Sequence, residues 1–193
     1  MRIPIFIALA ALAGCGPLGQ VNQGQVVAYL PDKGEITFIA DSNYRDPGHP
    51  RFDVLPPVTV HVPLNPKEMG PEPEAGRLLA LDASNGRAVI YDPAASSFET
   101  VKITVVSRHD GVSATDARVR RIRFPVHDQS KGTITVYRAR THQLIEFSVP
   151  EQYRGLPDEA WRAGDEIRYY YRDPGRALRL MNVTRTDLSK GEK

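Results

Sequence analysis

Arginines are the most concentrated of the side chains in this sequence that could do chemistry. Four lie close together in the run Arg118-Val119-Arg120-Arg121-Ile122-Arg123-Phe124. Guanidinium groups bind phosphate and carboxylate groups through paired hydrogen bonds. On an extended strand, Arg118 and Arg120 would face one side while Arg121 and Arg123 face the other. The run therefore predicts either an anion-binding strand or a solvated strand that pairs with acidic parts of the same protein.

Tyrosines form a second candidate contact surface in Arg168-Tyr169-Tyr170-Tyr171-Arg172. Strand alternation places Tyr169 and Tyr171 on one face and Tyr170 on the other. A tyrosine ring offers an apolar body with a polar tip, which suits ligand contact as well as core cover. We take Tyr169 and Tyr171, with the four arginines, as speculative binding residues, and core cover as the alternative.

The five histidines show none of the spacings of a metal site on a helix. His109-Asp110 and His127-Asp128 pair an imidazole with a carboxylate, but both lie in apparent turns, where aspartate hydrogen-bonds the backbone. The oxygen side chains of Asp41 to Asp46 could bind calcium, yet the glycine and glutamate of an EF-hand are missing. The motifs of serine hydrolases, P-loops and dinucleotide sites are also missing from the sequence. We therefore expect no catalytic residue, no metal, no cofactor and no enzyme activity.

The only cysteine, Cys15, follows a basic start at Met1-Arg2 and the apolar run Ile3 to Ala13. This pattern is typical of a secretory signal and is too short to span a bilayer. Leu12-Ala13-Gly14-Cys15 resembles the lipobox of bacterial lipoproteins, which implies cleavage after residue 14 and a lipid on the Cys15 thiol. The alternative is an ordinary secretory signal with an incidental cysteine.

A lipid on Cys15 predicts a membrane-anchored protein of the cell envelope that faces the periplasm. Gly16 replaces the aspartate that retains lipoproteins in the inner membrane, so the resemblance favours the outer membrane. An acylated thiol leaves no cysteine for a disulfide or a metal site. We expect no nucleic-acid partner, because an exported lipoprotein rarely meets one.

Short strands joined by turn signals must position these residues. Sixteen prolines, fifteen glycines and frequent β-branched residues favour an all-β protein. Hairpins are predicted around Pro31-Asp32-Lys33-Gly34, Ser84-Asn85-Gly86 and Asp173-Pro174-Gly175. A short helix is predicted from Pro157 to Ala163. Further strands are expected at 58–62, 100–107, 118–126, 133–139 and 143–149.

Several of these elements recur in the same order. Gly24 to Tyr29 resembles Gly132 to Tyr137, and Ala75-Gly76 recurs as Ala163-Gly164. A duplication with an insertion at 41–57 would explain this order. The alternative is chance, because strands and turn signals recur in any β-protein. The order of elements predicts two linked small β-barrels of OB or SH3-like type.

The domain organisation follows from these predictions. Charge divides the chain as well, because acidic residues prevail before residue 100 and basic residues after it. Such a division could steer a partner or could reflect two solvated surfaces. We expect a signal peptide at 1–14, a lipidated linker at 15–23, a first β module at 24–107 with a long loop at 41–57, a second β module at 108–187 and a flexible tail at 188–193.

Two segments carry a family resemblance: Gly70-Pro71-Glu72-Pro73-Glu74-Ala75-Gly76, and the run from Gly164 to Gly175 with Arg168-Tyr169-Tyr170-Tyr171-Arg172 at its centre. The whole chain resembles an uncharacterised family of bacterial lipoproteins, a domain of unknown function, from sulfate-reducing bacteria. This resemblance implies a lipoprotein and supplies no activity or site residues.

These observations predict a non-catalytic envelope lipoprotein that binds or scaffolds another envelope protein. The alternative is a module that binds anionic envelope ligands, such as lipid head groups or cell-wall polymers, through the basic strand. A contiguous arginine and tyrosine face around a concave mouth would favour the ligand, whereas a broad, flat apolar patch would favour the protein partner.

Overall fold

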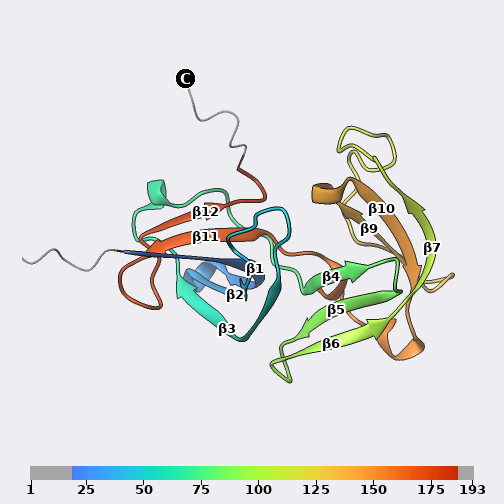
Figure 1. The fold of residues 1–193 in the computed structure, drawn as a ribbon, viewed down its shortest axis with the longest axis horizontal. Helices are drawn as coiled ribbons and strands as arrows, with labels where there is room; N and C mark the ends of the chain where they lie inside the picture. The colour runs from blue at the N-terminus through green and yellow to red at the C-terminus, as the bar shows by residue number, and fades with distance from the viewer. Residues whose placement is uncertain (1–18, 187–193) are drawn as a thin grey trace, which may run out of the picture.

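The described part of the chain, residues 19–186, consists of two β-rich bodies that lie side by side (Figure 1). In this computed structural model, the described strands form three sheets, accompanied by one α-helix and several single 3-10 turns. The predicted all-β class with one short helix is confirmed. The predicted signal peptide, Cys15 and the tail at 188–193 lie outside the described residues.

The first body, called the terminal body here, joins the two ends of the described chain in one antiparallel sheet of order β12-β11-β1-β2-β3. One face of the sheet packs a core around Val26, Phe38 and Leu180. Its strands are β1 (Gln20–Leu30), β2 (Glu35–Asp41), β3 (Phe52–His61), β11 (Glu166–Tyr171) and β12 (Arg179–Asn182).

The second body, called the middle body, contains a three-stranded and a four-stranded sheet around a common core. The short helix α1 (Asp158–Trp161) buries Trp161 in this core, where its ring centroid lies 5.8 Å from that of Phe147. The three-stranded sheet has β4 (Leu78–Asp82), β5 (Arg87–Asp92) and β6 (Ser97–Lys102). The four-stranded sheet has β7 (Thr104–His109), β10 (Gln143–Ser148), β9 (Thr133–Arg138) and β8 (Val126–Asp128). The 3-10 turn η2 (Pro66–Glu68) lies between β3 and β4, and η4 (Glu151–Tyr153) lies between β10 and α1.

Two hairpins close with the same kind of turn. Between β1 and β2, η1 (Pro31–Lys33) is followed by Gly34 at φ 60°. Between β9 and β10, η3 (Ala139–Thr141) is followed by His142 at φ 51°. In both, the N–H of the left-handed residue donates to the carbonyl that begins the turn. These matching turns stand where the repeat aligns Gly24 to Tyr29 with Gly132 to Tyr137, which supports the predicted duplication.

The predicted closed barrels are not formed, because within residues 19–186 every sheet keeps two edges. The terminal body comes nearest to closure. Its sheet bends at a bulge between Val26 and Ala28. Isolated bridges join His61 to Arg176 and Met69 to Leu180, but neither extends into a ladder.

The two bodies do not follow one another along the chain, as the predicted modules 24–107 and 108–187 would. β11 pairs with β1 at the opposite end of the chain, with Gln25 opposite Glu166. The hairpin β4–β5 instead shares the middle-body core with β9 and β10. The second hairpin of each predicted repeat therefore belongs to the body built on the first hairpin of the other repeat.

This exchange has a close crossing at its centre, formed by the repeated Ala-Gly pairs. Val26 of β1 accepts a hydrogen bond from the N–H of Gly76 at 3.1 Å and donates its own N–H to Asp165 at 2.9 Å. A Cβ on Gly164 would overlap the Val26 carbonyl, and a Cβ on Gly76 would lie 2.6 Å from the Gly164 nitrogen. Both positions require glycine because two backbones pass each other there.

Two predicted strands are also corrected. The segment 100–107 is split between β6 and β7, which lie in different sheets on either side of Ile103. The segment 118–126 has a turn at 118–121, with Arg121 at φ 67°, then irregular chain, and only Val126 begins a strand. The Asp116 carbonyl accepts the N–H groups of Val119 and Arg120, which is a helical-type turn. The strand faces predicted for Arg118 to Arg123 are therefore not formed, because this part of the run is a turn.

Candidate functional site

The four predicted binding arginines lie in the connection between β7 and β8, and they form no strand face. Arg118 binds the Asp116 carboxylate through Nε and Nη2 at 3.0 and 2.7 Å, and this pairing lowers the pKa of Asp116. Arg123 donates to Glu74 at 3.0 Å. Arg120 and Arg121 are exposed and form no ion pair with any residue of 19–186.

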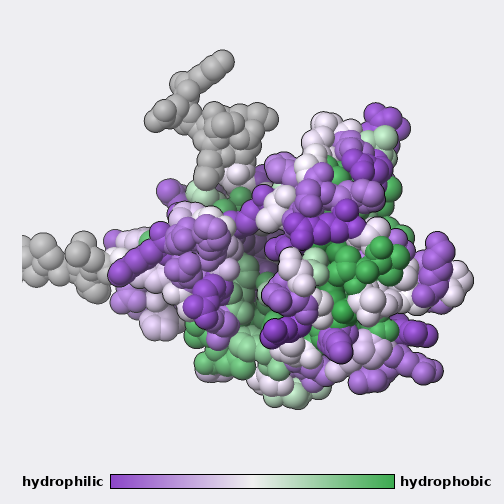
Figure 2. Space-filling model, turned by 45° about the vertical axis from the view of Figure 1, so that its right-hand side comes forward, coloured by the Kyte–Doolittle hydropathy of each residue, from purple (hydrophilic) through white to green (hydrophobic). Residues whose placement is uncertain are grey.

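Figure 2 shows strongly hydrophilic residues at the upper right of the molecule, on the side where Figure 1 places the connection between β7 and β8. An exposed loop of this kind does not line a concave mouth. The predicted basic strand face is therefore not present as a site.

The predicted binding tyrosines lie in the terminal body, apart from the arginines. Tyr169 is only 3% exposed and packs edge-on against Phe38, with ring centroids 5.5 Å apart. Tyr171 stacks on Tyr169 at 5.0 Å and donates its hydroxyl to Gln20 at 2.8 Å. These tyrosines cover a core, which is the alternative reading of their alternation. The structure does not bring them together with the arginine run in one face.

A buried polar cluster joins the two bodies. Gln23 donates its side-chain N–H groups to Asp41 at 3.1 Å and to Glu166 at 2.7 Å. Arg168 donates twice to the Gln23 amide oxygen, at 2.9 and 2.6 Å. Arg140, at the tip of the β9–β10 hairpin, forms an ion pair with Glu166 across the junction. Burial raises the pKa of the Glu166 carboxyl, Arg140 opposes the rise, and nearby Asp41 adds to it.

A second charged cluster surrounds Glu74 on the other side of the crossing. Its carboxylate binds Arg123, Arg162 and Arg185, with N–O distances of 3.0, 3.3 and 2.8 Å. Burial raises the pKa of Glu74, but the three guanidinium groups outweigh it and the net pKa is lowered. Both clusters are internally paired, so they hold the bodies together and leave little capacity for a ligand.

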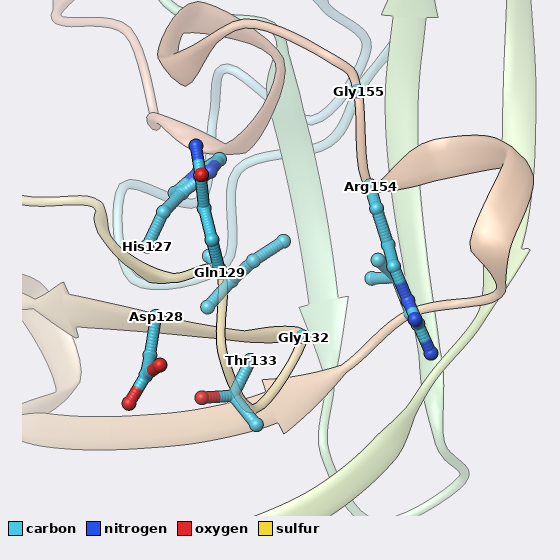
Figure 3. A pocket seen from close by; sticks show the side chains of 9 residues that line it. His127, Asp128, Gln129, Gly132, Thr133, Arg154 and Gly155 are labelled. Atoms are coloured by element: carbon cyan, nitrogen blue, oxygen red, sulfur yellow. The ribbon is translucent and has the colours of Figure 1, made fainter.

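The best candidate site is a pocket of about 270 Å³ in the middle body (Figure 3). Its apolar floor is made of Ile134 and Val149, which belong to the buried core. Its walls come from two segments: the β8–β9 hairpin, and the chain that leaves β10 through η4. The wall residues are His127, Asp128, Gln129, Gly132, Thr133, Arg154 and Gly155.

Two of the polar wall residues are already occupied. The Asp128 carboxylate accepts the hydroxyl of Ser130 at 2.6 Å and the N–H of Lys131 at 3.1 Å, and these bonds lower its pKa to about 2. This is the turn role that the sequence predicted for His127-Asp128. Thr133 donates its hydroxyl to Glu146 at 2.9 Å. Neither side chain needs a ligand.

Two other wall residues, Arg154 and Gln129, have polar groups that lack partners in the described structure. The His127 Nε2 also makes no hydrogen bond, but it is buried from solvent and lies 3.6 Å from the Asp158 carboxylate, so a ligand in the pocket cannot reach it. Arg154 makes no ion pair within the described range, and Gln129 makes no side-chain hydrogen bond there. In Figure 3, Gln129 and Arg154 stand on opposite sides of the pocket.

Arg154 is exposed, and its guanidinium lies close over the turn at Gly132. A Cβ added to Gly132, which has φ 62°, would come within 3.1 Å of the Arg154 guanidinium carbon and Nε. A glycine at this turn therefore allows the cation to lie close over the backbone. The result is an unpaired cation beside an apolar floor, an arrangement that can bind an anion with an apolar body.

Sequence reasoning did not find this pocket. The sequence pairs His127 with Asp128 in a turn and gives no sign of a cavity, and Arg154 lies in no cluster. The only signal in the sequence was the placement of His127-Asp128 just before the second hairpin of the repeat.

Among residues 19–186, no group of three or more histidine, cysteine, aspartate and glutamate side chains is placed to hold a metal ion. None of the helices within this range is long and apolar enough to cross a membrane.

Comparison with known proteins gives a family and no activity. No curated protein and no solved structure matches this chain significantly. The predicted resemblance is confirmed at the level of a domain of unknown function. A single sequence profile covers nearly the whole chain, residues 17–191, and the chain therefore belongs to the family described as Domain of unknown function (DUF4881).

Proposed function

We propose that this protein is a lipid-anchored, non-catalytic binding protein of the cell envelope, and that its middle-body pocket holds a small carboxylate with an apolar body. The observation that carries the proposal is Arg154, a cation without an ion-pair partner among the described residues, placed beside the apolar floor of Ile134 and Val149. This keeps the predicted class of anionic ligand and moves its site from Arg118–Arg123 to Arg154.

The size and charge of the pocket support this ligand class. A volume of about 270 Å³ lies just below the usual range of ligand sites and suits a small molecule better than a polymer segment. One guanidinium balances one negative charge, which favours a monocarboxylate over a phosphate dianion. The Gln129 amide would then satisfy a second polar group of the ligand.

The anchor is supported by the sequence motif Leu12-Ala13-Gly14-Cys15. Acyl chains on Cys15 would hold the protein at the membrane, because each buried methylene contributes about 0.8 kcal/mol. A periplasm-facing position, with the outer membrane favoured by Gly16, completes the proposal. Such a protein would present its ligand at a membrane surface to another envelope protein.

A thermal-shift panel tests the pocket. Small aliphatic and aromatic carboxylates are compared with their own amides, which keep the shape and lose the charge. Unfolding is followed by the fluorescence of Trp161, the only tryptophan, which is fully buried. We expect at least one acid to raise the melting temperature where its amide does not, because a ligand stabilises the state that binds it.

Two variants control this experiment. Arg154→Met removes the charge beside the pocket and should abolish the shift. Arg120→Met removes an exposed arginine from the β7–β8 connection and should leave the shift intact. A shift that survives Arg154→Met, or amides that stabilise as well as their acids, would contradict the proposed ligand class.

A protein partner is the second candidate, and exposed edge strands favour it. Val54 and Leu55 on β3, Val106 on β7 and Val126 on β8 are all exposed, and each of these strands is the edge of a sheet. An open edge with apolar side chains can accept a strand from another protein. Crosslinking in intact cells should then capture one recurrent envelope protein, which Val106→Lys should displace if β7 is the docking edge.

A further inference from the structure

The described chain enters the terminal body at Gly19, four residues after Cys15. Figure 1 places the start of β1, the end of β11 and the loop after β11 at the same end of the molecule, opposite the middle body. Gly19 lies directly against the Tyr170 ring. Val21 pairs with Tyr170 across the two strands, and the N–H of Leu178 donates to the Tyr170 carbonyl at 2.8 Å. Val21, Tyr170 and Leu178 are therefore neighbours, and they are called the tether face here.

The tether face is apolar at its exposed positions. Val21 is 61% exposed and Leu178 is 43% exposed, while Tyr170 is half-buried between them. Tyr170 and Leu178 also line a hollow with Glu68 and Arg179, whose charges pair with each other at 2.6 Å. A single exposed apolar residue is ordinary, but two beside a tyrosine at the point of attachment form a surface suited to a partner.

The charges around the tether face favour an anionic surface. Arg172 and Arg176 lie in the loop between β11 and β12 and are exposed, and neither makes an ion pair inside the range 19–186. Asp173 is the one acidic residue of that loop. Arginines bind phosphate groups, and tyrosines are enriched where a membrane meets water.

The short chain to Cys15 selects the bilayer as the occupant. Four residues reach at most about 14 Å, since an extended chain spans no more than about 3.6 Å per residue. A lipid on Cys15 would therefore keep the tether face within that distance of the lipid surface, whatever path the chain takes. We propose that the tether face rests on the membrane, with Val21 and Leu178 among the head groups, Tyr170 at the interface, and Arg172 and Arg176 on lipid phosphates.

This inference rests on the proposed lipid anchor, and it has a consequence for the pocket. With the terminal body on the membrane, the middle body and its pocket point away from the lipid (Figure 1). The pocket would then be open to small molecules and to other envelope proteins.

Site-specific labelling of the full, lipidated chain tests the orientation. Acylated Cys15 has no free thiol, so a new cysteine is the only reactive one. Leu178→Cys and Val106→Cys place the same fluorophore on the tether face or on β7 of the middle body, and both side chains are exposed. The proteins are reconstituted in phosphatidylethanolamine and phosphatidylglycerol vesicles that contain a lipid with a nitroxide at its head group. The label at 178 should be quenched at least about threefold more strongly than the label at 106.

A second variant separates the tether face from the tether itself. Val21→Glu in the Leu178→Cys protein should lower the quenching, because a carboxylate resists entry into an anionic surface. Val106→Glu, its matched control, should leave the quenching unchanged. Equal quenching at 178 and 106, or no effect of Val21→Glu, would overturn the inference. Flotation with the vesicles reports separately on the anchor, so a protein that fails to float would overturn the anchor and the inference with it.

Discussion

The ion pair between Arg140 and Glu166 allows a prediction with a defined dependence on pH. Arg140 reaches from the tip of the middle body to a Glu166 side chain that is only 6% exposed, while Arg140 itself is 48% exposed. Arg140→Met keeps most of the stem and removes the charge. Removing one partner of a fully buried pair costs roughly 3–5 kcal/mol, and the exposure of Arg140 reduces this to about 2 kcal/mol at neutral pH.

The loss should shrink as the pH falls. The pKa of Glu166 is already raised in the folded protein above its ordinary value of 4.5, chiefly by burial, and removing Arg140 raises it further. A carboxyl with a raised folded pKa favours the folded state below its unfolded pKa, and that stability is lost as the pH rises through the folded pKa. At about pH 4, Glu166 is largely protonated in both the folded and the unfolded state, so Arg140→Met should lower the free energy of unfolding only slightly.

Urea unfolding followed by Trp161 fluorescence measures the free energy of unfolding at both pH values. Arg120→Met, which removes an exposed arginine, should change it by less than about 0.5 kcal/mol. In the Glu166→Gln protein, Arg140→Met should lower the free energy of unfolding by about 0.5 kcal/mol or less, because no buried carboxylate then loses its partner. A loss that is equal or larger at low pH, or that persists in full beside Glu166→Gln, would refute this reasoning.

Two further predictions concern the crossing and the long loop. Gly164→Ala places a methyl group on the β1 backbone and should destabilise the protein by about 3 kcal/mol or prevent folding, whereas Gly155→Ala, which has open space within the described structure, should be nearly neutral in the same unfolding assay. The Asp41 carboxylate accepts backbone N–H groups from both ends of the loop 42–51, at 2.8 and 2.7 Å, so trypsin should cut this loop faster in Asp41→Ala. Asp53→Ala removes only an exposed ion pair and should not change the cleavage rate. Equal cleavage rates for both variants would contradict the role of Asp41.

Local features of the fold were predictable because local chemistry determines them. The turns at Pro31 to Gly34 and Ser84 to Gly86 have residues that suit their dihedral angles, and the hairpins formed where these residues stand. A short helix forms after Pro157, as predicted, although it ends at Trp161 and not at Ala163.

Long-range features were not predictable from one sequence. The exchange of hairpins between the repeats depends on the pairing of β1 with β11. The alternation of side chains within a strand does not identify the strand with which it pairs. The strand predicted at 118–126 failed because Val119 and Ile122 recur at a turn spacing, with the Ile122 N–H bound to the Val119 carbonyl.

The pocket could not be seen in the sequence for the same reason. Arg154 and His127 lie in separate segments, and only the packing of η4 against the β8–β9 hairpin brings them to one cavity. Tyr169 and Tyr171 do not form a binding site, because strand alternation places side chains on one face of a sheet but does not determine whether that face is buried.

Calorimetric titration of one carboxylate and its amide tests the central claim most directly. The pair is chosen from the thermal-shift panel and titrated into the native protein and the Arg154→Met protein. We predict that the acid binds the native protein at least about tenfold more tightly than the amide, since a charged hydrogen-bonded pair contributes about 1.5–3 kcal/mol, and that this ratio falls to about one in Arg154→Met. A ratio near one in the native protein, or an undiminished ratio in Arg154→Met, would contradict the assignment of the pocket as a carboxylate site.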